Sequence, residues 1–180
     1  MLTITDNPKI KTSELMDTLR KQVEVYSYWN NAELDKNFLP PKETTTRTFA
    51  ATPEPDKETL GKSYDQLFPA AQGMTFREYI LAQMQYFKET GKYLDEKGWT
   101  VFSDERLPSG GVASGYWDPN GREIKFYWGN SDFVSPLLGA RLAISPSSSN
   151  LVPSAADTLE KRIEALEAFR SKVEGVLKLN

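Results

Sequence analysis

The 180-residue chain contains no histidine and no cysteine. Their absence removes the common ligands of zinc, copper and haem, every thiol nucleophile, and the side chain that most often transfers protons near neutral pH. It also excludes a disulfide scaffold and a lipid anchor attached to cysteine. Any chemistry must therefore depend on carboxylates, lysines, arginines, hydroxyl groups and the backbone.

Long apolar runs and basic runs are absent as well. No stretch approaches the ~18 consecutive apolar residues of a membrane-spanning helix, and residues 1–6 lack the basic and apolar regions of a signal peptide. No run of lysine or arginine exceeds two residues and the net charge is −3, which disfavours nucleic acid as a partner. We expect a cytoplasmic protein with its native start at Met1; an exported domain expressed without its leader is the alternative.

The motifs of nucleotide binding and nucleophilic catalysis are incomplete. Gly61-Lys62-Ser63 matches the end of a phosphate-binding loop, but the glycine that should stand five residues before Gly61 is Asp56. There is no G-x-S-x-G or S-x-x-K motif, and residues 118–121 lack the downstream acids of an EF-hand. We therefore predict no catalytic residue, no metal site and no cofactor.

Carboxylates near the predicted strands keep one enzymatic alternative open. Two carboxylates are sufficient for glycoside hydrolysis, provided that their pKa values are perturbed and that they face each other. The acids closest to the strands are Asp104, Glu105, Asp118, Glu123 and Asp132. Nothing in the sequence singles out a pair among them.

The composition is that of a folded domain. Hydrophobic residues make up 39% of the chain, and a chain of this length buries roughly two thirds of its unfolded surface without needing a disulfide or a metal. We expect a single domain over residues 1–180. The prolines at positions 40, 41, 53, 55 and 69 predict that residues 38–73 form an extended arm or linker between an N-terminal helix and the core.

Three helices are predicted from apolar spacing and capping residues. Leu15, Leu19 and Val23 recur every four residues and indicate a helix over about 12–31. A T-x-x-E capping box opens a second helix over about 75–97, with Gly98 placed to end it. The third helix, over about 157–179, has a continuous apolar stripe that would suit either its own sheet or a second helix.

Strands are predicted between the second and third helices. Residues 112–117 and 122–128 flank a turn at residues 118–121, and Phe126 alternates with Tyr127 on opposite faces of the second strand. Residues 99–104 and 140–144 are the other candidate strands. The sequence therefore predicts an α+β fold in which an antiparallel sheet of three to four strands, over about 99–145, is covered by the helices at 75–97 and 157–179.

Aromatic residues concentrate around the predicted hairpin and offer a candidate binding surface. Cross-strand packing explains such residues in part, but tyrosine and tryptophan on an outward face also dominate protein interfaces. The candidate partner-binding residues are Tyr116, Trp117, Tyr127 and Phe133, together with Tyr64 and Phe68 from the arm.

The first functional hypothesis is a non-catalytic protein–protein interaction module. Such a module would be a subunit of a larger assembly or a small binding or inhibitor protein, with another protein as its partner. Self-association through the helix at 157–179 is a further possibility. The alternatives are a carboxylate-based enzyme or a carbohydrate-binding domain that uses the aromatic hairpin.

Overall fold

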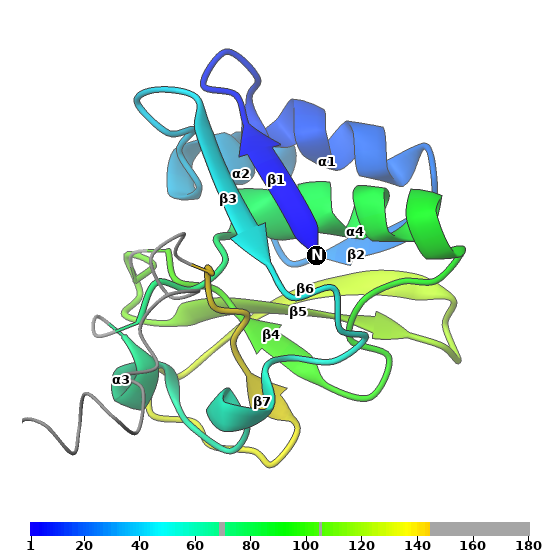
Figure 1. Ribbon diagram of the computed structural model, residues 1–180. Helices are drawn as coiled ribbons and strands as arrows, with labels where there is room; N and C mark the ends of the chain where they lie inside the picture. Colours follow the sequence, from blue (N-terminus) through cyan, green and yellow to red (C-terminus); the bar gives the residue numbers. More distant parts are fainter. Residues whose placement is uncertain (69–70, 105, 145–180) are drawn as a thin grey trace, which may run out of the picture. The chain divides into compact units, whose positions relative to one another are not determined.

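The computed structural model describes residues 1–68, 71–104 and 106–144 (Figure 1). Helices and strands are both present, which confirms the α+β class. The strands form a two-stranded sheet and a five-stranded sheet. The predicted helix at 157–179 lies outside the described residues.

The elements follow one another along the chain in a mixed order. They are β1 (Leu2–Asp6), α1 (Thr12–Arg20), β2 (Glu24–Ser27), α2 (Asn31–Asn37), β3 (Thr45–Phe49), the 3-10 helix η1 (Lys57–Thr59), α3 (Tyr64–Leu67), α4 (Phe76–Thr90), β4 (Trp99–Val101), β5 (Val112–Asp118), β6 (Glu123–Gly129) and β7 (Leu138–Gly139). Among the described residues, none of the helices combines the length and the hydropathy that a bilayer span requires.

The larger sheet is mixed, with strand order β2-β6-β5-β4-β7. The hairpin of β5 and β6 and the β4–β5 pair are antiparallel, as predicted. The two outer strands are parallel to their neighbours, β2 to β6 and β7 to β4. The prediction of an antiparallel sheet of three to four strands within 99–145 was therefore too small and missed both parallel pairs.

The predicted helix over 12–31 is wrong beyond Arg20. α1 ends there, the next residues form the edge strand β2, and α2 begins after Asn30, whose side chain makes a capping box with Glu33. The spacing of Leu15 and Leu19 is helical, but Val25 and its neighbours alternate between half-buried and exposed positions with a period of two. Pairing with β6 satisfies the backbone of this short segment better than an extension of the helix would.

α4 begins as predicted and ends earlier. Thr75 and Glu78 form the expected capping box at its start. The helix stops at Thr90 because Gly91 adopts the left-handed conformation, with φ of 71°, that glycine reaches without strain. Gly98 is therefore not the residue that ends the helix.

Residues 38–73, expected to form an arm or linker, contain β3, η1 and α3. β3 pairs with β1, a strand that the sequence analysis did not identify. The backbone near η1 is held by hydrogen bonds from Gly61 N to Leu138 O and from Asp56 N to Ala140 O. The expected strand at 140–144 is reduced to β7, just before it, and to an isolated bridge between Gly73 and Leu142.

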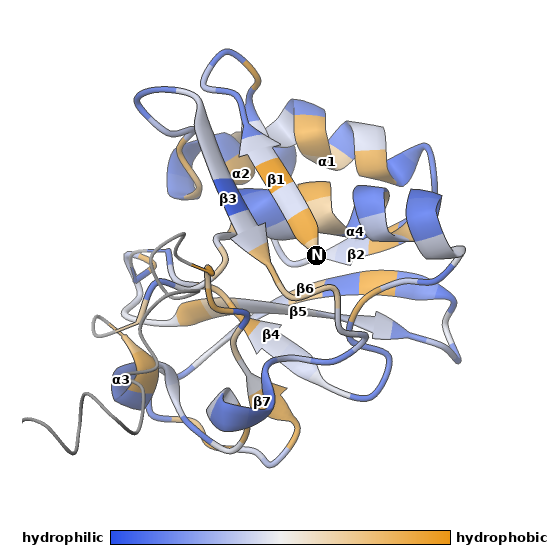
Figure 2. Ribbon diagram, viewed as in Figure 1, coloured by the Kyte–Doolittle hydropathy of each residue, from blue (hydrophilic) through white to orange (hydrophobic). Residues whose placement is uncertain are grey.

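The main core lies where α4 packs against β1, α1 and one face of the five-stranded sheet (Figure 1). Hydrophobic residues mark β1 and α1 in Figure 2. From α4, Phe76 and Ile80 are fully buried, as are Ile124 and Phe126 from β6. A second, smaller cluster joins α3 to the opposite side of the sheet; its buried members are Leu67, Phe68, Val101, Val112, Leu138 and Ala140.

Candidate functional site

The two faces of the β5–β6 hairpin divide its aromatic residues. Phe126 belongs to the core beneath α4, so the alternation of the strand places Tyr127 on the other face. Tyr116 lies on that same face, since its ring is nearly parallel to the Tyr127 ring with centroids 6.3 Å apart. Trp117 instead packs on the core side, where it stacks on Tyr93 at 4.5 Å.

Four aromatic rings form a continuous row across the sheet, which we call the aromatic ladder: Tyr26, Tyr127, Tyr116 and Trp99. Consecutive centroids are 5.0, 6.3 and 5.4 Å apart. The four residues come from β2, β6, β5 and β4, which are neighbours in the sheet in that order. Each ring thus supports the next, and such contacts each add about 0.5–1.5 kcal/mol beyond the area that they bury.

A pocket of about 410 Å³ lies along this ladder, and we call it the aromatic pocket. It is lined by Trp99, Val112, Ser114, Tyr116, Tyr127, Trp128, Gly129, Asn130, Phe133 and Leu138. Its volume and its mostly apolar lining are typical of sites that bind a small molecule or the side chains of a partner. Phe133 stands at the rim with 48% of its surface exposed.

The rim loop after β6 is fixed in place by contacts with α3. Ser131 Oγ donates to Asp65 Oδ2 at 2.9 Å, and Asp65 N donates to the backbone oxygen of Ser131. Arg106 donates to both side chains. These contacts hold the loop that carries Phe133 beside the sheet, so the pocket has a preformed wall.

Exposed hydrophobic residues gather around the same face. Of the nine large hydrophobic residues that are exposed in the described chain, six lie in or next to β2, at the end of β6, or in the rim loop. They are Tyr26, Tyr28, Trp128, Phe133, Val134 and Leu137. Clusters of exposed apolar side chains on a folded protein mark interaction sites more often than isolated ones do.

Three carboxylates lie side by side across the same face, beyond the ladder, and we call them the acidic row: Glu24, Glu123 and Asp118. In the strand register Glu24 is opposite Glu123, and Glu123 is opposite Asp118. Lys125 Nζ lies 2.6 Å from Asp118 Oδ2 and 3.2 Å from Glu123 Oε1. The hydrogen bond from Lys125 lowers the pKa of Asp118, and the same bond raises the pKa of Lys125.

Three of the six predicted partner-binding residues come together in the aromatic pocket: Tyr116, Tyr127 and Phe133. Trp117 lies on the other face of the sheet. Tyr64 begins α3 and Phe68 directly follows it; their rings pack against each other at 5.0 Å and line a separate hollow. Phe68 is almost completely buried in the second core cluster.

Two ladder residues were missed by the sequence analysis. Tyr26 falls in the segment predicted as a helix, where its alternation with Val25 was the available signal. Trp99 was placed correctly at the start of a strand, but its face cannot be assigned until the β4–β5 register is known. Both positions depend on pairing between distant parts of the chain.

The candidate catalytic carboxylates that the structure describes do not converge on the aromatic pocket, and Glu105 lies outside the described residues. Asp118 and Glu123 are engaged by Lys125 in the acidic row. Asp104 accepts a hydrogen bond from Phe76 N at the start of α4, and burial raises its pKa to about 7. Within the described part of the chain there is also no cluster of three or more acids suited to hold a metal ion.

Asp104 shares a hollow of about 180 Å³ with other charged side chains. Glu78 lies there, and burial raises its pKa too, but its Oε2 atom already accepts from Thr75 N and from Arg47. Arg77 is engaged by Asp6 through two hydrogen bonds of 2.9 and 2.6 Å. Glu78 and Arg77 are therefore held by neighbouring charged side chains, and Asp104 by the start of α4, which is a structural arrangement.

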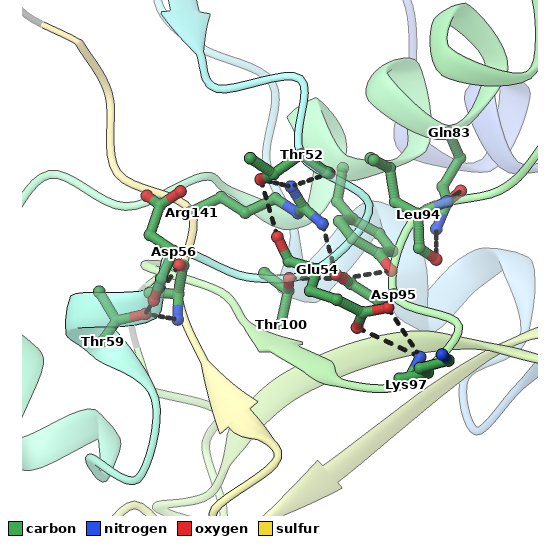
Figure 3. Close-up of polar contacts among 12 residues, drawn as sticks. Thr52, Glu54, Asp56, Thr59, Gln83, Leu94, Asp95, Lys97, Thr100 and Arg141 are labelled. Carbon is green, nitrogen blue, oxygen red and sulfur yellow. Dashed lines mark hydrogen bonds and ion pairs between the residues drawn. The ribbon is translucent and has the colours of Figure 1, made fainter. Parts of the chain in front are cut away.

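A second buried network joins distant segments (Figure 3). Asp95 accepts hydrogen bonds from Tyr79, Thr100 and Arg141, and all four side chains are inaccessible to solvent. Arg141 also donates to the backbone oxygen of Thr52. A substrate cannot reach these groups, so the network serves to hold the segment at residue 52 against α4 and β4.

Neither the family models, nor the curated proteins, nor the solved structures with which the chain was compared match it. A function is therefore inferred from the aromatic pocket and the residues around it.

Proposed function

We propose that the protein is a non-catalytic binding module that holds a partner protein on the face of the sheet that carries the aromatic ladder. The observation that carries this proposal is the aromatic pocket, whose lining includes two exposed hydrophobic residues, Trp128 and Phe133. Aromatic side chains in pockets that exclude water supply much of the binding energy at protein interfaces. Both forms of the hypothesis, an assembly subunit and a small inhibitor, would use this surface.

The lining of the pocket favours a protein partner over the alternatives. Apart from the tyrosine hydroxyls and the two indole N–H groups, the polar side chains among its described lining residues are Ser114 and Asn130, which is few for a sugar with hydroxyl groups around its ring. Among the described residues, none of the candidate carboxylates lines it, which disfavours a hydrolytic reaction in this pocket.

Affinity capture with substituted baits tests the proposal. The wild-type protein, the double variant Tyr127→Ala/Phe133→Ala and the control Leu39→Ala would be immobilised and exposed to an extract of the source cells. Leu39 is 71% exposed and lies outside the pocket, so Leu39→Ala removes an exposed apolar side chain without changing the pocket. Thermal unfolding of all three baits would confirm that each is folded.

The proposal expects a partner that is retained by the wild type and by Leu39→Ala and is lost from the double variant. Because truncation of a central interface residue costs about 2 kcal/mol or more, the loss should be at least tenfold. Partners retained equally by all three baits would contradict the proposal.

Two further predictions belong to this proposal. Action in the cytoplasm would be tested by localising the tagged protein in its own cells. Self-association through residues 157–179, which lie outside the described residues, would be tested by light scattering over a wide range of protein concentrations.

A further inference from the structure

We infer that the partner binds through an extended, basic segment, which places an apolar side chain in the aromatic pocket and a lysine or arginine against the acidic row. This inference rests on the proposed function and specifies the chemistry of the partner. It follows from the layout of side chains on one face of the sheet.

The acidic row and the aromatic ladder share that face. Side chains two residues apart on a strand point the same way, so Glu24 lies on the side of Tyr26, and Asp118 on the side of Tyr116. Glu123 and Tyr127 share this face of β6 for the same reason. A ligand in the aromatic pocket therefore meets the acidic row without leaving the sheet surface.

The acidic row has more negative charge than its surroundings neutralise. Lys125 is the one base in contact with it among the described residues, and it pairs with Asp118 and Glu123. Glu24 is exposed and forms no ion pair in the described part of the chain. Three carboxylates thus face one ammonium group.

Fold stability does not account for this arrangement. Like charges directly opposite each other on neighbouring strands destabilise a sheet, and Glu24 stands directly opposite Glu123. A cationic group from a partner would relieve this repulsion, so the charge that is unfavourable in the free protein becomes favourable in the complex.

The other charged groups around this face do not offset the acidic row. Arg106, on the far rim of the pocket, is already paired with Asp65. Arg122 is exposed in the turn before β6, and no ion pair links it to the acidic row within the described residues. Asp132, in the rim loop beside Phe133, is exposed and forms no ion pair within the described residues. The face is therefore negative at the pocket rim as well as at the strand ends.

The distance between the two features sets the spacing within the partner. Ser114, in the pocket, and Asp118 are four residues apart on β5, which corresponds to about 13 Å at ~3.3 Å per residue. In an extended segment, side chains two or four residues apart point to the same side. With the length of a lysine or arginine side chain included, the basic residue should stand two or four positions from the apolar anchor.

Aromatic surroundings also favour a cationic segment. Tyr26 is 42% exposed and stands two residues after Glu24 on the same face of β2, and the faces of exposed aromatic rings attract lysine and arginine. The same chemistry would not favour an acidic partner, whose charges would add to the repulsion among the three carboxylates.

Selection from a random dodecamer peptide library displayed on phage tests the inference, with the full-length protein as the immobilised target. Enriched peptides would then be synthesised and their affinities measured by fluorescence anisotropy against four proteins. These are the wild type, Glu24→Lys, the control Glu43→Lys and the pocket variant Phe133→Ala. Both glutamates are exposed, so neither reversal of charge should prevent folding.

The expected peptides carry a lysine or arginine two or four positions from an aromatic or aliphatic residue. Their affinity should fall about three- to tenfold in Glu24→Lys and stay unchanged in Glu43→Lys, because an exposed charge pair contributes modestly. It should also weaken as the salt concentration is raised from 50 to 300 mM.

The failures of the two proposals are distinguishable. One outcome is a set of peptides that need Phe133 for binding but have no excess of basic residues and bind Glu24→Lys as well as the wild type. This outcome overturns the inference of a basic segment and leaves the proposed function standing. Peptides that bind without needing Phe133 count against the proposed function itself. No enrichment at all overturns the inference that the partner contributes a linear segment.

Discussion

Arg141 donates a hydrogen bond to Asp95 in the interior of the protein, where neither side chain has access to solvent. Asp95 holds a left-handed backbone conformation, with φ of 64°. Its other carboxylate oxygen accepts from Tyr79 and Thr100. Residues from α4, β4 and the end of the described chain are therefore joined at one carboxylate.

Asp95→Asn should destabilise the protein by about 3 kcal/mol, because removing one partner leaves the buried Arg141 charge uncompensated. Asparagine also adopts the left-handed conformation, so the substitution removes charge without adding backbone strain. The free energy of unfolding in urea measures the effect. Asp17→Asn, which removes an exposed ion pair with Arg20, is the control and should change it by less than about 1 kcal/mol. Equal losses of unfolding free energy in the two variants would show that the buried network stabilises the protein no more than an exposed ion pair does.

The two faces of β5 should respond differently to truncation. Trp117→Ala should lower the free energy of unfolding by about 2 kcal/mol, because Trp117 packs on the core side against Tyr93, and should leave partner binding unchanged. Tyr116→Ala should weaken binding at least tenfold with a smaller loss of stability. Urea unfolding and the affinity of a selected peptide provide the two measurements. A binding defect in Trp117→Ala as large as that in Tyr116→Ala would contradict this assignment of faces.

Asp104 should make stability depend on pH between pH 4 and 7. Its pKa is 3.8 in the reference state and about 7 in the folded protein, because burial disfavours the charged carboxylate. The folded state therefore binds the proton more tightly, and the stability that protonation gives is lost as pH rises through about 7. From pH 5 to pH 8 this loss should be roughly 3 kcal/mol, because the two pH units below the folded pKa contribute 1.36 kcal/mol each.

Asp104→Asn should remove this part of the pH dependence. Its amide oxygen can still accept the hydrogen bond from Phe76 N, so the start of α4 keeps its partner. Urea unfolding of both proteins at pH 5 and pH 8 gives the comparison. Parallel pH profiles would show that Asp104 titrates in the folded protein as it does in the unfolded chain.

Gly91→Ala should lower the free energy of unfolding by about 1 kcal/mol, because alanine resists the left-handed conformation that ends α4. A Cβ atom at this position meets nothing within 4 Å, so the cost is conformational and not steric. Gly129 also has open space for a Cβ atom but has no positive φ. Gly129→Ala is therefore a matched control, expected to be near neutral in thermal unfolding.

The parts of the fold that were predicted correctly are those specified by local sequence. The start of α4 follows from the Thr75–Glu78 capping box, and the β5–β6 hairpin follows from alternation around a turn in which Asp118 Oδ1 accepts from Asn120 N. The missed strands β1, β2 and β3 are four or five residues long and are stabilised by distant partners. Local propensity does not determine such pairings.

The faces on which the strand residues of the candidate site lie were also predicted correctly only where the sequence of a single strand determines them. Alternation along β6 correctly separated Tyr127 from Phe126, since it depends on one strand alone. Tyr26 and Trp99 join the ladder through β2–β6 and β4–β5 pairing, which the sequence does not reveal. Trp117 was included among the candidate binding residues because tryptophan and tyrosine are both typical of protein interfaces. Successive residues of a strand point to opposite faces, however, so Trp117 lies on the core side and Tyr116 does not.

The parallel pairing of β2 with β6 also constrains how the protein can fold as it is synthesised. β1 and β3 can pair as soon as residue 49 has left the ribosome, whereas Glu24 cannot meet Glu123 until the hairpin has emerged. Throughout that interval, the edge of β2 and the ring of Tyr26 have no sheet to join. The face that we assign to partner binding is thus among the last parts of the nascent chain to become complete, and a partner can recognise it only after β6 has been made.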